Sequence, residues 1–449
     1  MNFYSEILKY KDELIKDLVG LVQIPSVLDR FDESNLEYPF GKDIRDALDY
    51  MLNLAKRDGF LVKNINNYAG HIEYGKGDEL IAALGHLDVV PATGIWSKEK
   101  FGGEIIDGKI YGRGTQDDKG PTIACYYALK MLKDLGLNFS KRFRLILGCD
   151  EESGSRCVKK YFENEEMPSF GFAPDANFPL INGEKGIISF DIVGEFKDPH
   201  IEYFKAGDRY NIVPDVACAK LNIDLKKEFL SYLKKNNYEG EVDDDVYTIK
   251  GKASHAMAPD KGINAISLLA KFLNKYLKND VIKLICNYLA DNEYGKKLGI
   301  DCYDEEMKHL TMNLAKIDYE DNEFKIGLNF RIPKIECVNM IKEGFAKVLN
   351  DFYLIQLNDC KVHYVPSDDN DVTTLLNAYK KYTGDVDAKA FTIGGGTYAQ
   401  SLTKGVAFGA MFKDSEETEH MPDEYMKIDD ILKAAAIYAE AIWELCKWD

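Results

Sequence analysis

The stretch LIAALGHLDVVP, residues 80–91, places an unbroken apolar run in front of a histidine and an aspartate and ends in a proline. Such a run is typical of a strand buried on both faces of a parallel sheet, and proline cannot extend the strand ladder. Alternate side chains of an extended chain share a face, so His86 and Asp88 point the same way. The aspartate could then orient the histidine toward a metal ion. A histidine that is merely hydrogen-bonded at a strand end is the alternative interpretation.

A second buried strand follows at 142–149, with the sequence RFRLILGC. Between the two strands, residues 120–136 repeat apolar side chains at helical spacing. The order strand–helix–strand indicates a parallel sheet with helices packed on its faces. We therefore predict an α/β fold with a mostly parallel central sheet flanked by helices.

The pattern of the chain changes twice. Helical periodicity at 4–22 and 427–446 belongs with this sheet, at the two ends of the chain. Between them, residues 187–366 alternate strands and helices in the manner of an inserted α+β domain. We expect one domain formed by residues 1–186 and 367–449 and a second domain formed by the insert.

Composition narrows the class of protein. The chain has 449 residues, 45% hydrophobic and 29% charged, which is typical of a globular protein with full cores. The net charge of −18 argues against a nucleic-acid partner, whose phosphates would be repelled. No apolar run is long enough to span a bilayer, and the amphipathic start differs from a signal peptide. Nine cysteines without a CxxC pair suit reduced thiols, so we expect a cytoplasmic protein.

Two adjacent acids, Asp117 and Asp118, stand in the glycine-rich stretch YGRGTQDDKGP at 111–121, where the helix of 120–136 begins. Acids at a helix N-terminus often only complement the helix dipole. A carboxylate can instead bridge two cations with its two oxygens, and the glycines let the backbone approach that closely. The sequence leaves both interpretations open.

Further acids and a histidine stand at the ends of predicted elements. LGCDEESGS (147–155) leaves a buried strand, FAPDANFP (172–179) follows another apolar segment, and ETEHMPDEY (417–425) precedes the last helix. These acids could lie in solvated loops, but ligands of open α/β sheets collect at the carboxyl ends of strands. Two histidines and three carboxylates suit two Zn²⁺-like ions that share one bridging ligand. The candidate ligands are His86, Asp117, Glu152, Asp175 and His420.

These stretches, together with GKASHAMAPDKGINA, NFRIP, GGGTYA and HMPDEY, resemble the successive signatures of a family of dinuclear zinc hydrolases. The family includes dipeptidase V, carnosinase, carboxypeptidase G and succinyl-diaminopimelate desuccinylase. The resemblance is strongest to the bacterial dipeptidase V type and covers essentially residues 1–449. Gln116 stands where relatives often carry a small residue, and the resemblance gives it no role. The resemblance implies a zinc-peptidase catalytic domain and, in residues 187–366, an α+β lid domain.

The resemblance also implies a role for each candidate residue. One ion is held by His86, Asp117 and Asp175. The other ion is held by Asp117, Glu152 and His420. Asp88 orients His86, and the peptide bond between Asp117 and Asp118 is cis. Glu151 is the general base, which takes a proton from the water between the ions and passes it to the leaving amine.

The insert and a later loop supply candidate substrate contacts. His255 is either a surface histidine or, by resemblance, the residue that stabilises the tetrahedral oxyanion. Arg331 stands among apolar strand residues and needs an anion, either a structural acid or a substrate carboxylate held bidentately. The stretch IGGGTYA, 393–399, is either a tight turn or a set of backbone amides that cradle a carboxylate. The remaining candidate contacts are Asn211, Gly394, Gly395, Gly396 and Thr397.

The residues and the resemblance together predict a metallo-dipeptidase, which cleaves dipeptides and short peptides with free termini through a metal-activated water. Two Zn²⁺ ions are the expected cofactors, with Mn²⁺ or Co²⁺ as alternatives. An N-acyl amino acid deacylase with the same metal site is the first alternative. A non-catalytic peptide-binding protein is the second, and the retained Glu151 disfavours it. Because the insert is large enough for a whole domain and holds two similar strand–helix sets, we expect a monomer with no nucleic-acid or membrane partner.

Overall fold

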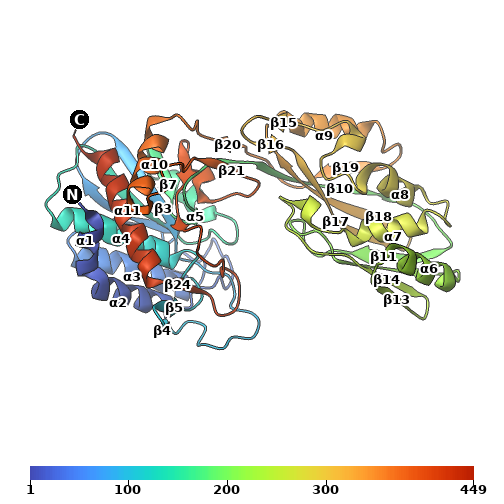
Figure 1. Ribbon diagram of the computed structural model, residues 1–449, viewed down its shortest axis with the longest axis horizontal. Coiled ribbons are helices and arrows are strands. Elements are labelled where there is room, and N and C mark those ends of the chain that lie inside the picture. The colour runs from blue at the N-terminus through green and yellow to red at the C-terminus, as the bar shows by residue number, and fades with distance from the viewer. Residues whose placement is uncertain (449) are drawn as a thin grey trace. The chain divides into compact units, whose positions relative to one another are not determined.

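The computed structural model describes residues 1–448, which form two compact units (Figure 1). The first unit comprises Met1–Asn182, Tyr364–Phe391 and the described residues from Thr397 onward. The second unit comprises Gly183–His363 and Thr392–Gly396. No helix within residues 1–448 is long and apolar enough to cross a membrane.

The first unit is built on a sheet whose central strands are parallel. From β6 (Arg142–Gly148) through β3 (Leu80–His86) and β7 (Phe170–Ala173) to β22 (Gly405–Ala407), neighbouring strands run in the same direction. The other strands of this sheet are β1 (Leu61–Ile65), β2 (Ala69–Gly75), β9 (Ile181–Glu184), β20 (His363–Tyr364) and β21 (Phe391–Ile393). The sheet order is β1-β2-β6-β3-β7-β22-β9-β20, β21 also pairs with β9, and strands β1 and β2 join antiparallel. Shorter strands are β4 (Glu104–Ile106), β5 (Lys109–Tyr111), β8 (Ala176–Asn177), β23 (Ala410–Met411) and β24 (Tyr425–Lys427).

Helices with long apolar faces pack against this sheet. α4 (Lys119–Asp134) contacts β3, α11 (Ile428–Cys446) contacts β6, and the two helices contact each other. Figure 1 shows the short helix α1 (Phe3–Ile7) beside both of them. The remaining helices of the unit are α2 (Lys11–Val22), α3 (Lys42–Arg57), α5 (Arg156–Phe162) and α10 (Asn370–Thr383). Every residue of α4 up to Leu132 is buried, so this helix forms the centre of the first core.

The end of β3 lies very close to the start of α4. A Cβ added at Gly85 would lie 2.1 Å from Oγ1 of Thr122, so only glycine allows the strand to approach the helix this closely. The backbone N–H of His86 donates to Oδ2 of Asp118 at 3.1 Å and joins the two elements. The apolar run before His86 is completely buried in β3, as the sequence predicts.

The second unit is an α+β unit with one antiparallel sheet. Its strands are β10 (Gly186–Glu195), β11 (Ile201–Ala206), β12 (Val216–Leu221), β13 (Gly240–Asp243), β14 (Val246–Lys250), β17 (Thr311–Glu320), β18 (Glu323–Ile332) and β19 (Tyr353–Gln356). The order is β13-β14-β12-β11-β17-β18-β10-β19, so the pair β11–β17 joins two four-stranded sets. Its helices are α6 (Lys226–Asn236), α7 (Ala265–Leu273), α8 (Asp280–Leu284) and α9 (Cys337–Ala346), and a small hairpin is formed by β15 (Tyr303–Asp304) and β16 (Lys308–His309).

The structure confirms the predicted fold class, with a parallel central set of strands flanked by helices and an α+β insert. The predicted helix at 4–22 is divided into α1, a 3₁₀ segment at Leu8–Tyr10 and α2. The prediction of reduced thiols is wrong for Cys302 and Cys337, which form a disulfide with Cα atoms 6.5 Å apart, while seven other cysteines are free. The pairing arises because α9, which begins at Cys337, packs against Leu298 and Ile300, and no local sequence pattern reveals that contact.

Candidate metal centre

All five predicted ligands lie in the first unit, at strand ends or in loops. His86 is the last residue of β3, and Asp117 lies in the turn before α4. Glu152 follows β6, Asp175 follows β7, and His420 lies between β23 and β24. Because β3, β6 and β7 are parallel neighbours, their carboxyl ends meet at one edge of the sheet. The five side chains form two groups, each compact enough to hold a metal ion.

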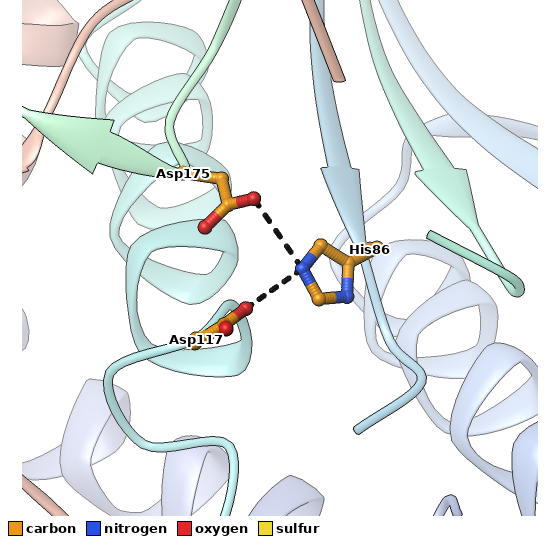
Figure 2. A group of neighbouring side chains, drawn as sticks. All are labelled: His86, Asp117 and Asp175. Atoms are coloured by element: carbon orange, nitrogen blue, oxygen red, sulfur yellow. Dashed lines mark ion pairs between the residues drawn. The ribbon is translucent and has the colours of Figure 1, made fainter. Parts of the chain in front are cut away.

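The first group consists of His86, Asp117 and Asp175, whose side chains point toward one another (Figure 2). Nε2 of His86 lies 2.9 Å from Oδ1 of Asp117 and 3.5 Å from Oδ2 of Asp175. Nδ1 of His86 lies 2.9 Å from the backbone carbonyl oxygen of Asp88. Because a carbonyl only accepts, Nδ1 carries the hydrogen, and in the neutral ring the lone pair of Nε2 would face the two carboxylates.

This arrangement fits a cation. Nε2 of His86 and Oδ1 of Asp117 are enclosed, and neither has a hydrogen-bond partner among the described residues. A lone pair that faces two partly buried carboxylates is repulsive unless positive charge lies between them. Burial lowers the pKa of His86, but the carboxylates of Asp117 and Asp175 raise it well above its usual range. A proton on the ring therefore offsets part of this repulsion. A divalent ion between these atoms would offset the repulsion more fully, because it brings two positive charges. Imidazole with carboxylates is a donor set for Zn²⁺ and similar metals.

The second group consists of Asp117, Glu152 and His420. Nε2 of His420 lies 2.9 Å from Oδ2 of Asp117 and 3.0 Å from Oε1 of Glu152. Asp117 therefore turns one oxygen toward each histidine, as a ligand that bridges two ions does. The alternative interpretation of Asp117 as a helix cap does not account for this pairing.

The carboxylates of the two groups repel one another. Burial and the charge of Asp117 raise the pKa of Asp175, and burial raises that of Glu152. Burial, together with the charges of Asp175 and Glu152, raises the pKa of Glu151 to about 8. Asp117 is the exception, because its contacts with the imidazoles of His420 and His86 outweigh its burial and hold its pKa well below the usual range. Positive charge bound at this position would relieve the repulsion.

Asp88 connects the end of β3 to the acidic turn after β6. Its carboxylate accepts the backbone N–H of Glu151 through Oδ1 and that of Glu152 through Oδ2, both at 3.1 Å. Oδ1 of Asp88 also lies 3.5 Å from Nδ1 of His86. Asp88 thus fixes the positions of both glutamates relative to His86.

The peptide bond between Asp117 and Asp118 is cis, as the resemblance predicts. Asp118 turns away from the two groups of ligands. Its Oδ2 accepts the N–H of His86 and, at 2.9 Å, the hydroxyl hydrogen of Thr122. Asp118 therefore holds β3 against α4 while its neighbour faces the histidines.

Sequence reasoning missed two buried side chains that join the loop of Asp117 to the loop of His420. The first is Glu424, whose Oε1 accepts the backbone N–H groups of Gly114, Gln116 and Asp117 at distances between 2.8 and 3.3 Å. This carboxylate, only four residues after His420, supports the backbone on which the bridging aspartate stands. Its position in the HMPDEY stretch was visible in the sequence, but nothing there separated it from a surface acid.

The second is Gln116, whose amide group spans the same two loops. Its Oε1 accepts the N–H groups of Thr418 at 2.7 Å and Glu419 at 2.8 Å. Its Nε2 donates to the carbonyl oxygens of Glu416 at 2.9 Å and Tyr425 at 3.3 Å. The departure at position 116 from the small residue of relatives was the one signal that could have pointed to this role.

The predicted contacts of the insert lie together in the second unit. The carbonyl of Asn211 accepts the N–H of Ala256, the residue after His255, at 2.8 Å. Thr311, which pairs with Arg331 across β17 and β18, donates its hydroxyl hydrogen to the carbonyl of Ala256 at 3.3 Å. Burial and the charge of Arg331 lower the pKa of His255.

Arg331 is only 3% exposed. Its Nε donates to Oδ1 of Asn329 at 3.0 Å and its Nη1 to the carbonyl of Gly394 at 2.9 Å. Burial lowers the pKa of Arg331 to about 10. Its contacts within residues 1–448 are to neutral oxygens, so the structural acid that the sequence left open is not found there.

The glycine segment divides between the units. Gly394, Gly395 and Gly396 belong to the second unit and Thr397 to the first. A Cβ added at Gly394 would lie 2.7 Å from Cβ of Met257, so glycine is needed where this segment meets the loop of His255. The hydroxyl of Thr397 accepts the N–H of Ala399 at 3.2 Å.

Comparison with known families places the chain. Residues 82–444, which include all five candidate ligands, match the family model described as peptidase family M20/M25/M40. The chain belongs to this family. As an M20 family member it is a peptidase, a hydrolase of peptide bonds.

Relatives align with this M20 family member over nearly its whole length. It is 41% identical to a Staphylococcus epidermidis protein named "Putative dipeptidase", covering 99% of each chain. It is 40% identical to a Bacillus subtilis protein named "Putative dipeptidase YtjP", covering 100% of each. Its fold is similar to that of aminoacylhistidine dipeptidase from Vibrio alginolyticus, with a TM-score of 0.59, 12% identity and 97% of each chain covered.

Proposed function

We propose that the protein is a metal-dependent dipeptidase that hydrolyses dipeptides and short peptides with free termini. The observation that carries this proposal is the position of Asp117, whose two oxygens each lie 2.9 Å from Nε2 of a histidine, His86 or His420. Two ions that share one carboxylate can hold a water and a peptide carbonyl side by side. The names of relatives 40–41% identical over nearly the whole chain support dipeptides as the substrate class.

Two Zn²⁺ ions are the proposed cofactors, with Mn²⁺ or Co²⁺ as alternatives. One ion would be held by His86, Asp117 and Asp175. The other would be held by Asp117, Glu152 and His420. When bound, the ions would lower the pKa of a water and polarise the peptide carbonyl. One imidazole and two carboxylates for each ion accept all three metals, so metal analysis of the purified protein is needed to distinguish them.

Glu151 is the proposed general base. Its backbone is fixed by Asp88, and it belongs to neither group of candidate ligands. Its pKa of about 8 reflects burial among other acids, and cations bound beside it would lower that pKa toward a value suited to accepting a proton at neutral pH. Glu151 would then take a proton from the water and give it to the leaving amine.

The second unit would supply contacts to the rest of the substrate. His255 would stabilise the oxyanion, and Arg331 would hold the terminal carboxylate, since its guanidinium has no acid partner within residues 1–448. Asn211 would contact the scissile group. The backbone of Gly394, Gly395 and Gly396, with Thr397, would complete the carboxylate site.

We further propose that residues 1–186 and 367–449 form the catalytic domain and residues 187–366 a lid domain. The joining of two four-stranded sets in one sheet favours a monomer, in which His255 serves its own chain. Mixing inactive His255→Ala with inactive Glu151→Gln protein tests this, because activity would return only if one chain completed the site of another. Seven of the nine cysteines are free, which favours a cytoplasmic location, whereas the pair Cys302–Cys337 does not add to this support.

The deciding experiment is a hydrolysis panel with and without chelator. We expect cleavage of dipeptides with free termini, little cleavage of N-acetyl or N-succinyl amino acids, loss of activity on chelation and recovery with Zn²⁺ or Mn²⁺. Faster cleavage of the N-acyl amino acids would instead identify a deacylase. Full activity in a verified metal-free preparation would end the metal-dependent proposal.

A further inference from the structure

Two buried cations of the second unit have no carboxylate partner among residues 1–448. Lys185, just before β10, is 9% exposed, and Arg331 in β18 is 3% exposed. The ammonium group of Lys185 donates to the carbonyl of His309 at 2.5 Å. Within residues 1–448, the contacts of both side chains are to neutral oxygens. In a chain of net charge −18, two buried cations without an acid indicate a site that is completed by an anion.

Lys185, through its backbone, and Arg331, through its guanidinium, bind adjacent residues of one segment. The backbone N–H of Lys185 donates to the carbonyl of Ile393 at 3.0 Å, and Nη1 of Arg331 donates to the carbonyl of Gly394. In the pairing of β10 with β18, Arg331 stands opposite Ile187, two residues after Lys185. Burial, and after it the charge of Arg331, lowers the pKa of Lys185 to about 8, which places the two charges within electrostatic reach of each other.

Both cations keep donors for a further partner. An ammonium group has three N–H donors, and Lys185 uses one of them in its contact with His309. Arg331 uses Nε and Nη1 in its two hydrogen bonds. Its Nη2 has no partner in the described part of the chain and is not enclosed. An anion can therefore reach donors of both residues.

We propose that Lys185 is a specificity-determining residue that binds the side-chain carboxylate of an acidic C-terminal residue in the dipeptide. The inference rests on the proposed function, in which Arg331 binds the terminal carboxylate. A C-terminal aspartate or glutamate brings two carboxylates and neutralises both buried cations. A neutral C-terminal residue neutralises one and leaves Lys185 unpaired, which is the costly arrangement. The preferred substrates are therefore dipeptides that end in aspartate or glutamate.

The test compares substrates that differ by one charge at nearly constant shape. We measure kcat/KM of the metal-loaded protein for Ala-Asp against Ala-Asn and for Ala-Glu against Ala-Gln. The wild type should favour the acids by roughly tenfold or more, because hydrogen bonds between charged groups are about twice as strong as neutral ones. Lys185→Met should bring both ratios to about one or below, and Lys185→Arg should retain the preference. The matched control is Lys325→Met, which removes one exposed positive charge from the strand of Arg331 and should leave the ratios unchanged.

The outcomes separate the inference from the proposed function. If no dipeptide is cleaved, the proposed function is wrong and the inference falls with it. If Ala-Asn and Ala-Gln are cleaved but the wild type does not favour the acids, only the inference is overturned. It is also overturned if Lys185→Met lowers kcat/KM equally for acid and amide, or if Lys325→Met abolishes the preference. Because the wild-type ratios need no variant, a Lys185→Met protein that fails to fold still leaves the inference open to contradiction.

Discussion

His86 and His420 present the same atom, Nε2, to the same aspartate at the same distance of 2.9 Å, yet the protein holds them in different ways. The His86 side chain is fully buried at the end of a parallel strand, and its Nδ1 is fixed by the carbonyl of Asp88. The His420 side chain is 51% exposed, stands in a loop at a φ of 61°, and has no Nδ1 partner among the described residues.

One candidate ion position is therefore part of the core, and the other is assembled between loops. The ring of His86 cannot move without moving β3, because its N–H and its Nδ1 are both bonded within the first unit. The ring of His420 depends on Gln116 and Glu424, which fix its loop to that of Asp117. We therefore expect the His86 side to bind metal more tightly and to exchange it more slowly, since fixed outer partners raise metal affinity.

Glu151 and Glu152 are neighbours, but their substitution should have different consequences. Glu151→Gln should lower kcat by about 10²–10⁴-fold and leave the bound metal unchanged, because the amide cannot accept the proton and Glu151 belongs to neither group. Glu152→Gln should instead lower the metal bound on the His420 side. Metal analysis and kcat on one dipeptide measure both. If Glu151→Gln loses metal, the roles of the two glutamates are exchanged.

The second effect compares the histidines in protein freed of metal by chelation. His86→Ala should cost about 2–4 kcal/mol of unfolding free energy, because it leaves a buried cavity and a carbonyl without its donor. His420→Ala should cost less than His86→Ala, because its half-exposed side chain leaves no buried cavity and solvent screens its ion pairs with Asp117 and Glu152. Urea unfolding of the two variants measures the difference. Equal losses would show that the exposed position is as much a part of the structure as the buried one.

The candidate ligands could be named from the sequence because each follows a recognisable apolar run or precedes a helix, and the structure brings their side chains together in two groups. The run before His86 forms β3 as predicted, and the parallel order of β6, β3 and β7 brings the acids that follow those strands to one edge. The roles of Gln116 and Glu424 were not predicted because their hydrogen bonds join residues about 300 positions apart, such as Gln116 and Thr418. Most of their partners are backbone amides, which every residue type except proline provides, so no sequence pattern identifies them.

Tertiary contacts between distant residues also explain why the sequence did not reveal the disulfide or the partners of Arg331. The disulfide between Cys302 and Cys337 depends on how α9 packs within the second unit, which spacing alone does not encode. The sequence could not show that Arg331 has no acid partner within residues 1–448, because a structural acid could have come from any distant segment. Periodicity predicts elements and their ends, whereas the partners of a buried polar group follow from tertiary packing.

The third effect is kinetic and concerns the two ions in the wild type. Under limiting chelator, metal should leave in two phases, the first about 10- to 100-fold faster than the second, as expected if the outer partners of His86 account for the difference. The fast phase should be absent from His420→Ala, which would start with only the slow ion. Metal retained on the protein is measured against time. A single phase for both ions would contradict the comparison of the two sides.

The smallest effect tests the connection that holds the His420 loop. Gln116→Ala removes the acceptor of the Thr418 and Glu419 N–H groups, so the loop should lose its fixed position relative to Asp117. Because removing an outer partner typically weakens metal binding by 10–100-fold, we expect the low end, about tenfold, on the His420 side, with the His86 side unchanged. The matched control is Gln23→Ala, which deletes an exposed glutamine that bonds one carbonyl far from this loop in sequence. A metal titration of each variant resolves the two affinities. If Gln116→Ala weakened both sides alike, the amide would stabilise the unit as a whole, and the special dependence of His420 on its loop would have to be abandoned.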